Sequence, residues 1–394
     1  MITKEKKAKW ERVSEEVIKY YSDGDYDSAL CVLNEIIEEC PGYLDAWIHR
    51  GSVWNQKKEY EKAISDYKVV IRSLRQPKLE IDSDPILIIG YVYGLMSSAY
   101  MNMEDYNNGL FYSILSIELK PSDNLQAWAN NAFAWCRLGN FENSVKNYGE
   151  CLKIKSDDPK FWFNRACSLA DLKQYNDALF NVGEAIKLSP KDSLYHCMKS
   201  QILSSKGMID NSIDVATFSI SIEPSRKAYN IRGQNWLHKK EYRIALKDFK
   251  KSIDIDDDCK KDEAIAWSGL GTSLSHLKRY SESLDAFSNA IHIEPNLVIA
   301  WANRGSTYAT MGNYELAESD LKKALKLDPN NANANYNLGM MEEKRDNMKE
   351  KWWKRWKWFW IKNGNMEFYA GNQDFSNQLI RTGDVVLNKF SIVG

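Results

Sequence analysis

The chain has 394 residues, 44% of them hydrophobic, and its 53 Lys and Arg residues nearly balance its 54 Asp and Glu residues. The resulting net charge of −1 argues against a general nucleic-acid-binding protein, because such proteins need a basic field that releases counterions. With only 20 Gly and 9 Pro, an architecture of strands and tight turns is also disfavoured.

The N-terminal sequence and the cysteines indicate a cytoplasmic protein. Residues 1–7 (MITKEKK) have no apolar stretch of the kind found in secretory signals. The longest apolar run, residues 86–96, is too short to span a bilayer. The cysteines are odd in number and form no C-x-x-C pair, so we expect reduced thiols. They are Cys31, Cys40, Cys136, Cys151, Cys167, Cys197 and Cys259.

A short motif of an aromatic, a small and usually another aromatic residue recurs along the chain. Its instances are Trp47, Gly51, Trp54; Tyr93, Ser97, Tyr100; Trp128, Ala132, Trp135; Trp267, Gly271, Leu274; and Trp301, Gly305, Tyr308. A Tyr or Phe follows each instance after six to nine residues, and an Ala or Ser usually comes three residues later, as in Tyr60–Ala63 and Tyr314–Ala317. This spacing predicts two helices per unit, joined by a short loop.

The Tyr or Phe that follows each motif fixes the register of the repeat. It stands at residues 26, 60, 106, 141, 175, 242, 280 and 314, with Ile209 taking its place in one unit, so the spacings are 34, 46, 35, 34, 34, 33, 38 and 34. The pattern resembles the tetratricopeptide repeat, whose period is 34 residues. The resemblance covers nine units from about Trp10 to Pro329, with a tenth first helix at 332–344. It implies an all-α, right-handed superhelical solenoid of stacked antiparallel helix pairs.

The residue types of the motif have a packing explanation. We predict that the small residue eight places into each unit, such as Gly51 or Gly305, lets the first helix approach the second. The small residue of the second helix, such as Ala63, lies opposite, and aromatics fill the wedge between them. No pair can bury its apolar faces alone, so the stack supplies the stability.

Two insertions interrupt the period. Twelve extra residues fall around residues 75–85, where Ser83-Asp84-Pro85 is typical of a helix start. We expect this insertion to lengthen the loop and the first helix of the third unit. Four more residues fall near 258–262.

Catalytic and metal-binding motifs are missing from the sequence. None of the five His residues has metal-ligand spacing, and no nucleotide-binding or hydrolase motif occurs. The acidic run at residues 254–258 lacks the Gly and Glu of a calcium loop. We therefore expect no enzyme and no cofactor.

The resemblance also implies a binding surface. In the tetratricopeptide family, residues two, five, six, nine, twelve and thirteen of each unit face a concave groove. Asn130, Asn164 and Asn303 share the sixth position. In the related enzymes that attach N-acetylglucosamine to proteins, such asparagines grip a peptide backbone, since an amide can donate and accept at once. The predicted groove residues are Gln126, Asn130, Phe133, Arg137, Lys160, Phe163, Asn164, Cys167 and Asn303.

Two alternatives remain open for particular side chains of this surface. Phe133 and Phe163 either face a ligand or pack against neighbouring helices. Arginines occupy the seventh position of four units and either border the groove or form ion pairs with acids of the second helix. These are Arg50, Arg165, Arg232 and Arg304.

The C-terminal part differs from the repeats. We divide the chain into a solenoid at residues 1–344 and a Trp-rich helix with an irregular tail at residues 345–394. Residues 349–362 hold five of the 14 tryptophans. Trp352, Trp356 and Trp360 form one helical stripe. The stripe is expected to cap the last unit, to dock a partner or second copy, or to lie at a membrane interface.

The sequence therefore predicts a scaffold or adaptor that holds a peptide segment or partner protein in its groove. The alternative is a regulatory or sensor subunit that holds an effector enzyme through its Trp-rich tail. We expect a protein or peptide partner, no nucleic acid and no membrane, with self-association through the tail as a further option.

Overall fold

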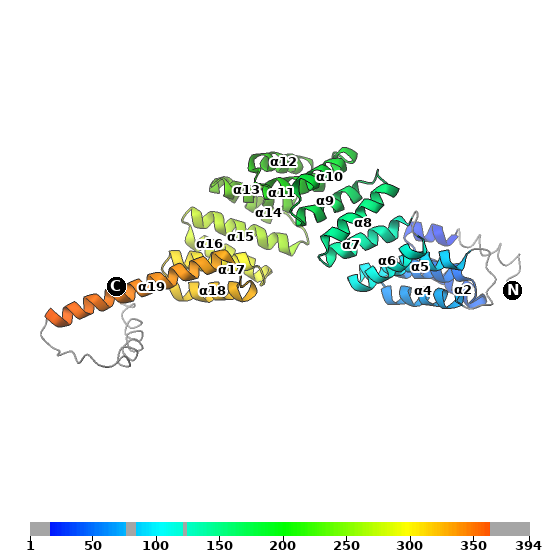
Figure 1. The fold of residues 1–394 in the computed structure, drawn as a ribbon, viewed down its shortest axis with the longest axis horizontal. Helices are drawn as coiled ribbons and strands as arrows, with labels where there is room; N and C mark the ends of the chain where they lie inside the picture. The colour runs from blue at the N-terminus through cyan, green and yellow to red at the C-terminus, as the bar shows by residue number, and fades with distance from the viewer. Residues whose placement is uncertain (1–15, 76–83, 121–123, 363–394) are drawn as a thin grey trace. The chain divides into compact units, whose positions relative to one another are not determined.

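The computed structural model describes residues 16–75, 84–120 and 124–362, without the side chains of residues 345, 348, 356, 357 and 359–362. All regular secondary structure in these ranges is helical (Figure 1). The chain divides into two compact units, Met1–Pro295 and Asn296–Gly394. Each unit is described by itself below.

The first unit contains eight consecutive helix pairs within its described residues. The first pair is formed by the helical residues 16–23 and α2 (Tyr26–Glu39). The other pairs are α3 (Leu44–Gln56) with α4 (Tyr60–Leu74), α5 (Pro85–Asn102) with α6 (Tyr106–Leu119), α7 (Leu125–Arg137) with α8 (Phe141–Ile154), α9 (Pro159–Asp171) with α10 (Tyr175–Leu188), α11 (Ser193–Ser205) with α12 (Ile209–Ile222), α13 (Arg226–His238) with α14 (Tyr242–Ile253), and α15 (Lys260–His276) with α16 (Tyr280–Ile293).

The second unit contains a ninth pair and one long helix. The pair is α17 (Val298–Thr310) with α18 (Tyr314–Leu327), and α19 (Ala332–Lys362) follows. Helix α19 packs against both α17 and α18 through its first turns. It continues without interruption through residues 344 and 345, where the sequence analysis divides the chain.

The helices of the first unit pack in the manner of a repeat stack. Each first helix packs against the second helix of its own pair, and each second helix packs against the first helix of the next pair. The eight stacked pairs of this unit and the α17–α18 pair of the second unit confirm the predicted all-α architecture of paired helices.

Glycine at the eighth position allows the close approach within a pair. A Cβ atom built on Gly51 would lie 2.5 Å from the ring of Tyr67, and one built on Gly271 would lie 2.8 Å from the ring of Phe287. Both rings are fully buried. The expected neighbour on the second helix is also in place, because the Ser283 hydroxyl donates to the Gly271 carbonyl at 2.7 Å. The predicted packing role of the small residues is therefore confirmed.

The turn inside each pair follows one backbone rule that the sequence analysis did not anticipate. The fifteenth residue of each 34-residue repeat, from the α3–α4 pair to the α17–α18 pair, has a positive φ. In three of these units it is glycine: Gly139, Gly207 and Gly312. In the other five it is Lys58, Glu104, Lys173, Lys240 or Lys278. The chain thus reverses through a left-handed residue even where no glycine is present.

The two insertions lengthen first helices. Helix α5 has 18 residues and α15 has 17, against 13 in α3, α7, α9, α11, α13 and α17. Asp84 caps α5 by accepting from the Ile86 amide, and Pro85 occupies its first turn. The expectation that the first insertion lengthens its helix is confirmed.

Candidate functional site

Two adjoining cavities follow the first helices of four consecutive pairs. The larger, about 570 Å³, is lined by residues from α5, the turn after it, α6, α7, α8 and α9. The smaller, about 370 Å³, is lined mainly by α3, α5 and α7. They share Met101, Asn102 and Asn130. We call the combined hollow the α3–α9 groove. Its size is within the range of known ligand sites.

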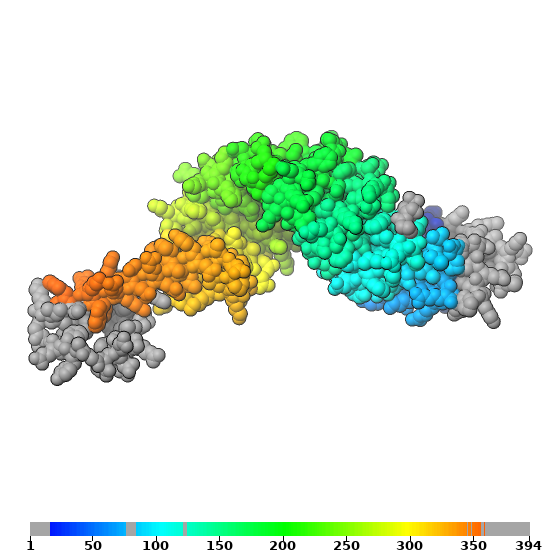
Figure 2. All heavy atoms as spheres, in the orientation of Figure 1, coloured from blue at the N-terminus to red at the C-terminus, as the bar shows by residue number. Residues whose placement is uncertain are grey.

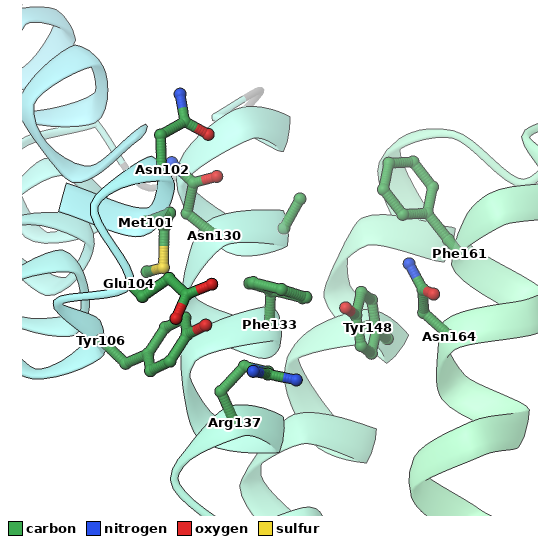
Figure 3. A pocket seen from close by; sticks show the side chains of 11 residues that line it. Met101, Asn102, Glu104, Tyr106, Asn130, Phe133, Arg137, Tyr148, Phe161 and Asn164 are labelled. Carbon is green, nitrogen blue, oxygen red and sulfur yellow. The ribbon is translucent and has the colours of Figure 1, made fainter. Parts of the chain in front are cut away.

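The larger cavity opens between α7 and α9. Of the consecutive first helices from α3 to α15, these two approach each other least closely. Phe133 of α7 and Asn164 of α9 therefore face each other across an opening, with Tyr148 of α8 between them (Figure 3). Burial raises the pKa of the Tyr148 phenol. The groove consequently has a neutral, partly apolar floor at this point.

The wall of the larger cavity combines aromatic rings with a cation. Phe133 is 41% exposed and meets the ring of Tyr106 edge-on, with the ring centroids 6.1 Å apart. The Arg137 guanidinium lies over the same Tyr106 ring at 5.1 Å. Arg137 lines the cavity, and among the described residues no carboxylate forms an ion pair with it. Such a wall suits an apolar side chain next to an acceptor group.

The smaller cavity is lined only by uncharged residues, many of them amides and hydroxyls. The Asn102 amide donates to the Asn55 Oδ1 atom at 3.3 Å. The Gln56 amide donates to the Tyr21 hydroxyl at 2.8 Å. These groups offer donors and acceptors without charge, which is the chemistry that a peptide backbone requires.

Asn130 is engaged within the protein. It is 7% exposed, and its Nδ2 atom donates to the Ser98 hydroxyl at 2.9 Å. Its Oδ1 atom accepts from Gln126 Nε2 at 2.8 Å. A ligand would have to displace Gln126 to reach that oxygen. Gln126 itself is exposed and is the more accessible member of the pair.

The remaining predicted groove residues of α9 are not part of these cavities. Lys160 is exposed outside them. Phe163 packs against the Tyr195 ring, with the centroids 5.1 Å apart, as the packing alternative in the sequence analysis proposes. Cys167 is half-buried against the core around Ala166, and burial raises the pKa of its thiol to about 12. Of the predicted set, the structure brings together Gln126, Asn130, Phe133, Arg137 and Asn164.

Asn303 belongs to the second unit and lies on α17. Its Oδ1 atom accepts from the Asn333 amide of α19 at 3.0 Å. Of the three predicted sixth-position asparagines, Asn130 and Asn164 line the α3–α9 groove.

Arginine at the seventh position is structural in three units. Arg232 donates from Nε and Nη2 to both carboxylate oxygens of Asp248, at 2.8 and 2.7 Å. Arg50 forms the same fork with Asp66, and Arg304 forms it with Asp320. Each guanidinium also lies over the aromatic residue three places before it: Trp47, Tyr229 or Trp301. The ion-pair alternative is therefore confirmed for these three arginines.

Arg165 departs from this arrangement because Asn181 stands where the other pairs have an aspartate. The Arg165 Nε atom and the Asn181 Oδ1 atom are both buried, and neither has a hydrogen-bond partner among the described residues. The Asn181 amide donates to the Asp177 carbonyl instead, at 2.8 Å. This repeat consequently lacks one cross-helix link.

Several groove residues were missed by the sequence analysis. They are Tyr21, Ser52, Asn55, Gln56, Tyr67, Leu95, Ser98, Met101, Asn102, Glu104, Tyr106, Ala129, Tyr148 and Phe161. The available signal was the register, because Ser52, Asn55 and Gln56 occupy positions nine, twelve and thirteen of their unit. Tyr106 and Tyr148 gave no signal, since both look like ordinary core aromatics of the motif.

The predicted docking residues lie on the second half of α19. Trp352 is 46% exposed there. The side chains of Trp356 and Trp360 fall outside the described residues, although their backbone is part of the helix. In the described part of the chain, no group of His, Cys, Asp and Glu residues could hold a metal ion. No helix of that part has the length and apolarity needed to cross a membrane.

Comparisons with known proteins agree with this geometry. Sequence models of the family described as Tetratricopeptide repeat match residues 159–192 and 298–331. Both matches begin where a first helix begins, at Pro159 and Val298. A human protein named Tetratricopeptide repeat protein 13 is 27% identical over 93 residues, which is 24% of this chain. The match spans only 10% of that relative's length.

Solved structures share the fold at low sequence identity. The crystal structure of the APC/C hetero-tetramer Cut9-Hcn1 matches 82% of this chain and 88% of that one, with a TM-score of 0.51 and 13% identity. A tetratricopeptide repeat protein from Parabacteroides merdae ATCC 43184 matches 67% of this chain and 98% of that one, with a TM-score of 0.49 and 14% identity. The first likeness supports the stacked helix pairs and nothing finer.

Proposed function

Because this chain is a tetratricopeptide repeat protein, we propose that it is a protein-binding scaffold that holds a segment of a partner in the α3–α9 groove. The observation that carries the proposal is the continuity of the two cavities along α3, α5, α7 and α9. The neighbour Cut9-Hcn1 is itself an assembly of two proteins. The groove runs across several helices, which suits an extended segment better than a compact small molecule.

The chemistry of the groove indicates which segment it would hold. The uncharged amides and hydroxyls around Asn55 and Asn102 would bind backbone groups. The opening between Phe133 and Phe161 would receive an apolar or aromatic side chain above Tyr148. Arg137 would bind a neighbouring acceptor, either a carboxylate or a carbonyl. The proposed ligand is an extended peptide with one apolar anchor and one acceptor next to it.

A peptide-display selection on the full-length protein tests the proposal. We expect the selected peptides to share an apolar anchor. Replacing Phe133 by Ala should weaken their binding about tenfold, because a truncated anchor contact commonly costs 1–2 kcal/mol. Fluorescence anisotropy with labelled peptides measures the affinity.

The matched control is Phe180→Ala. Phe180 is 61% exposed on α10 and lines neither cavity. Selected peptides that bind the Phe133 variant as tightly as the wild type would contradict the proposal. Asn130 is a poor probe, because losing its bonds to Ser98 and Gln126 would disturb the packing of α5 against α7.

A further inference from the structure

Helix α19 has two parts with different surroundings. Its first turns belong to the packed second unit: Ala334 is fully buried, Met341 is 2% exposed, and Leu338 packs against the cluster around Leu321. From residue 342 onward, every described side chain of the helix is exposed. The orange end of the helix extends past α18 in the space-filling view (Figure 2). The Trp-rich stretch thus begins beyond the last packed residue.

The composition of this exposed part differs from that of the rest of the chain. Residues 349–362 contain six Lys or Arg residues, one Glu and five Trp, while the whole protein has a net charge of −1. The described cations Lys349, Lys351, Lys354 and Arg355 are all exposed. Among them, only Lys354 forms an ion pair, with Glu350 at 2.6 Å. Residues 349–362 therefore carry a net charge of +5, from six cations and one acid.

The packed face of the helix continues into the aromatic face. Residues at intervals of three and four share one side of a helix. Steps of three or four residues lead from Ala334 through Leu338 and Met341 to Trp352, so Trp352 lies on the same side of the helix as these packed residues. Trp353 is the next residue in the chain. Trp352 and Trp353 are 46% and 43% exposed. Arg355, three residues after Trp352, and Lys351 flank Trp352 on the side of the helix away from Trp353, and their long stems let the charged ends reach outward from the aromatic side.

We propose that residues 349–362 of α19 dock on an anionic lipid surface and lie in its interface. Charge complementarity selects this occupant, because a segment with six cations and one acid is attracted to anionic headgroups. The aromatic residues support it as well, since Trp is enriched at the boundary between headgroups and acyl chains. The inference selects the membrane-interface alternative for the Trp stripe, although the overall expectation was of no membrane partner. It replaces the alternative of a cap on the last repeat, because the packed part of the helix ends at Met341.

Flotation of the full-length protein with vesicles tests the inference. One set of vesicles contains equimolar phosphatidylcholine and phosphatidylglycerol, and the other contains phosphatidylcholine alone. We expect binding to the anionic vesicles only, and a decrease in binding as salt is added. Trp352→Ala with Trp353→Ala should weaken binding about tenfold, since much of the inserted apolar area is removed. Lys351→Glu with Arg355→Glu changes the charge by four units and should weaken binding about 600-fold, at about fivefold for each unit of charge.

The matched control is Lys323→Glu with Lys326→Glu on α18, because both lysines are exposed and the change in net charge is the same. This control should lose little affinity. Circular dichroism checks that each variant keeps its helices. Absence of binding to anionic vesicles, or equal loss in the α18 control, would overturn the inference. Retention of RNA in place of vesicles, or a helix α19 buried in a dimer, would overturn it as well.

Discussion

A fork between a seventh-position arginine and an aspartate of the second helix recurs in three of the described repeats. Arg50, Arg232 and Arg304 each hold a nearly buried carboxylate with two charge-assisted bonds. Because the same guanidinium also lies over an aromatic ring, it links the start of the first helix to the middle of the second. Arginine at this position therefore stabilises the helix pair, and none of these three arginines lines the α3–α9 groove.

The repeat formed by α9 and α10 offers a test of this role. Asn181→Asp would place a carboxylate opposite Arg165 and supply the missing link, stabilising α9 and α10 by about 1 kcal/mol. Asp248→Asn should destabilise α13 and α14 by about 1–3 kcal/mol. Hydrogen exchange of the amides in these helices measures both effects.

The control for this pair of variants is Arg165→Met combined with Asn181→Asp. Without the guanidinium the new carboxylate has no partner, and the gain should become a loss. A gain that persists in the double variant would show that the fork is not its cause.

Thiol reactivity tests the burial of the cysteines. Cys31 and Cys259 are exposed, whereas burial raises the pKa of Cys151 and of Cys167 to about 12. Only the thiolate reacts with iodoacetamide. At mildly alkaline pH we expect rapid modification of Cys31 and Cys259, and none of Cys151 or Cys167 until the protein unfolds. Peptide mapping by mass spectrometry measures each rate. Early modification of Cys167 would mean that the packing around Cys167 and Phe163 opens in solution.

At the scale of the helices, the turn between the members of a pair depends on one left-handed residue. Gly139 has a φ of +80° at the end of α7, and no atom lies within 4 Å of a Cβ built there. A side chain at this position would meet no neighbouring atom, so any loss of stability would come from the positive φ of the backbone. The lysines that occupy the same position in other pairs bear that cost already.

Two glycines of the same pair should respond to alanine with opposite signs. Gly139→Ala should destabilise the pair by about 1 kcal/mol, because an L-residue is disfavoured at positive φ. Gly149→Ala should stabilise it by about 0.5–1 kcal/mol, since Gly149 lies inside α8 with open space around its Cβ position. Urea unfolding followed by circular dichroism compares the two variants. Effects of the same sign would contradict the role assigned to the turn.

The sequence predicted the helix pairs well because their spacing is a local property. The eighth-position glycines, the cap at Asp84 and the lengthened α5 all follow from residue type and register. The left-handed lysines could not be predicted, because lysine carries no signal for positive φ. The aspartate partners were foreseen as one of two alternatives, and only the structure could choose between them.

At the scale of the whole chain, the groove shows what register alone does not determine. The sixth-position rule identified Asn130 and Asn164, but the cavity depends on how far α7 and α9 stand apart. That distance arises from packing across several helices, so Phe133 lines the groove while Phe163 is covered by Tyr195. For the same reason, the sequence could not show at which residue α19 stops packing against α17 and α18.

The two proposed surfaces belong to different compact units and should act independently. Replacing Trp352 and Trp353 by Ala should leave peptide affinity within about twofold of the wild type, since neither residue lines the groove. Conversely, Phe133→Ala should leave vesicle binding unchanged. Anisotropy and flotation on the same protein preparations measure both. A loss of peptide affinity in the tryptophan variant would mean that α19 takes part in the groove.

Photo-cross-linking from inside the groove tests the central claim most directly. Phe133 and Phe180 are exposed phenylalanines of neighbouring pairs, and each can be replaced by the larger photoreactive analogue benzoylphenylalanine, because the exposed rings leave room for its added benzoyl group. With a selected peptide bound, irradiation should give a covalent product from position 133 and almost none from position 180. Cross-linking that is equal at the two positions, or greater at position 180, would show that the partner segment is held elsewhere.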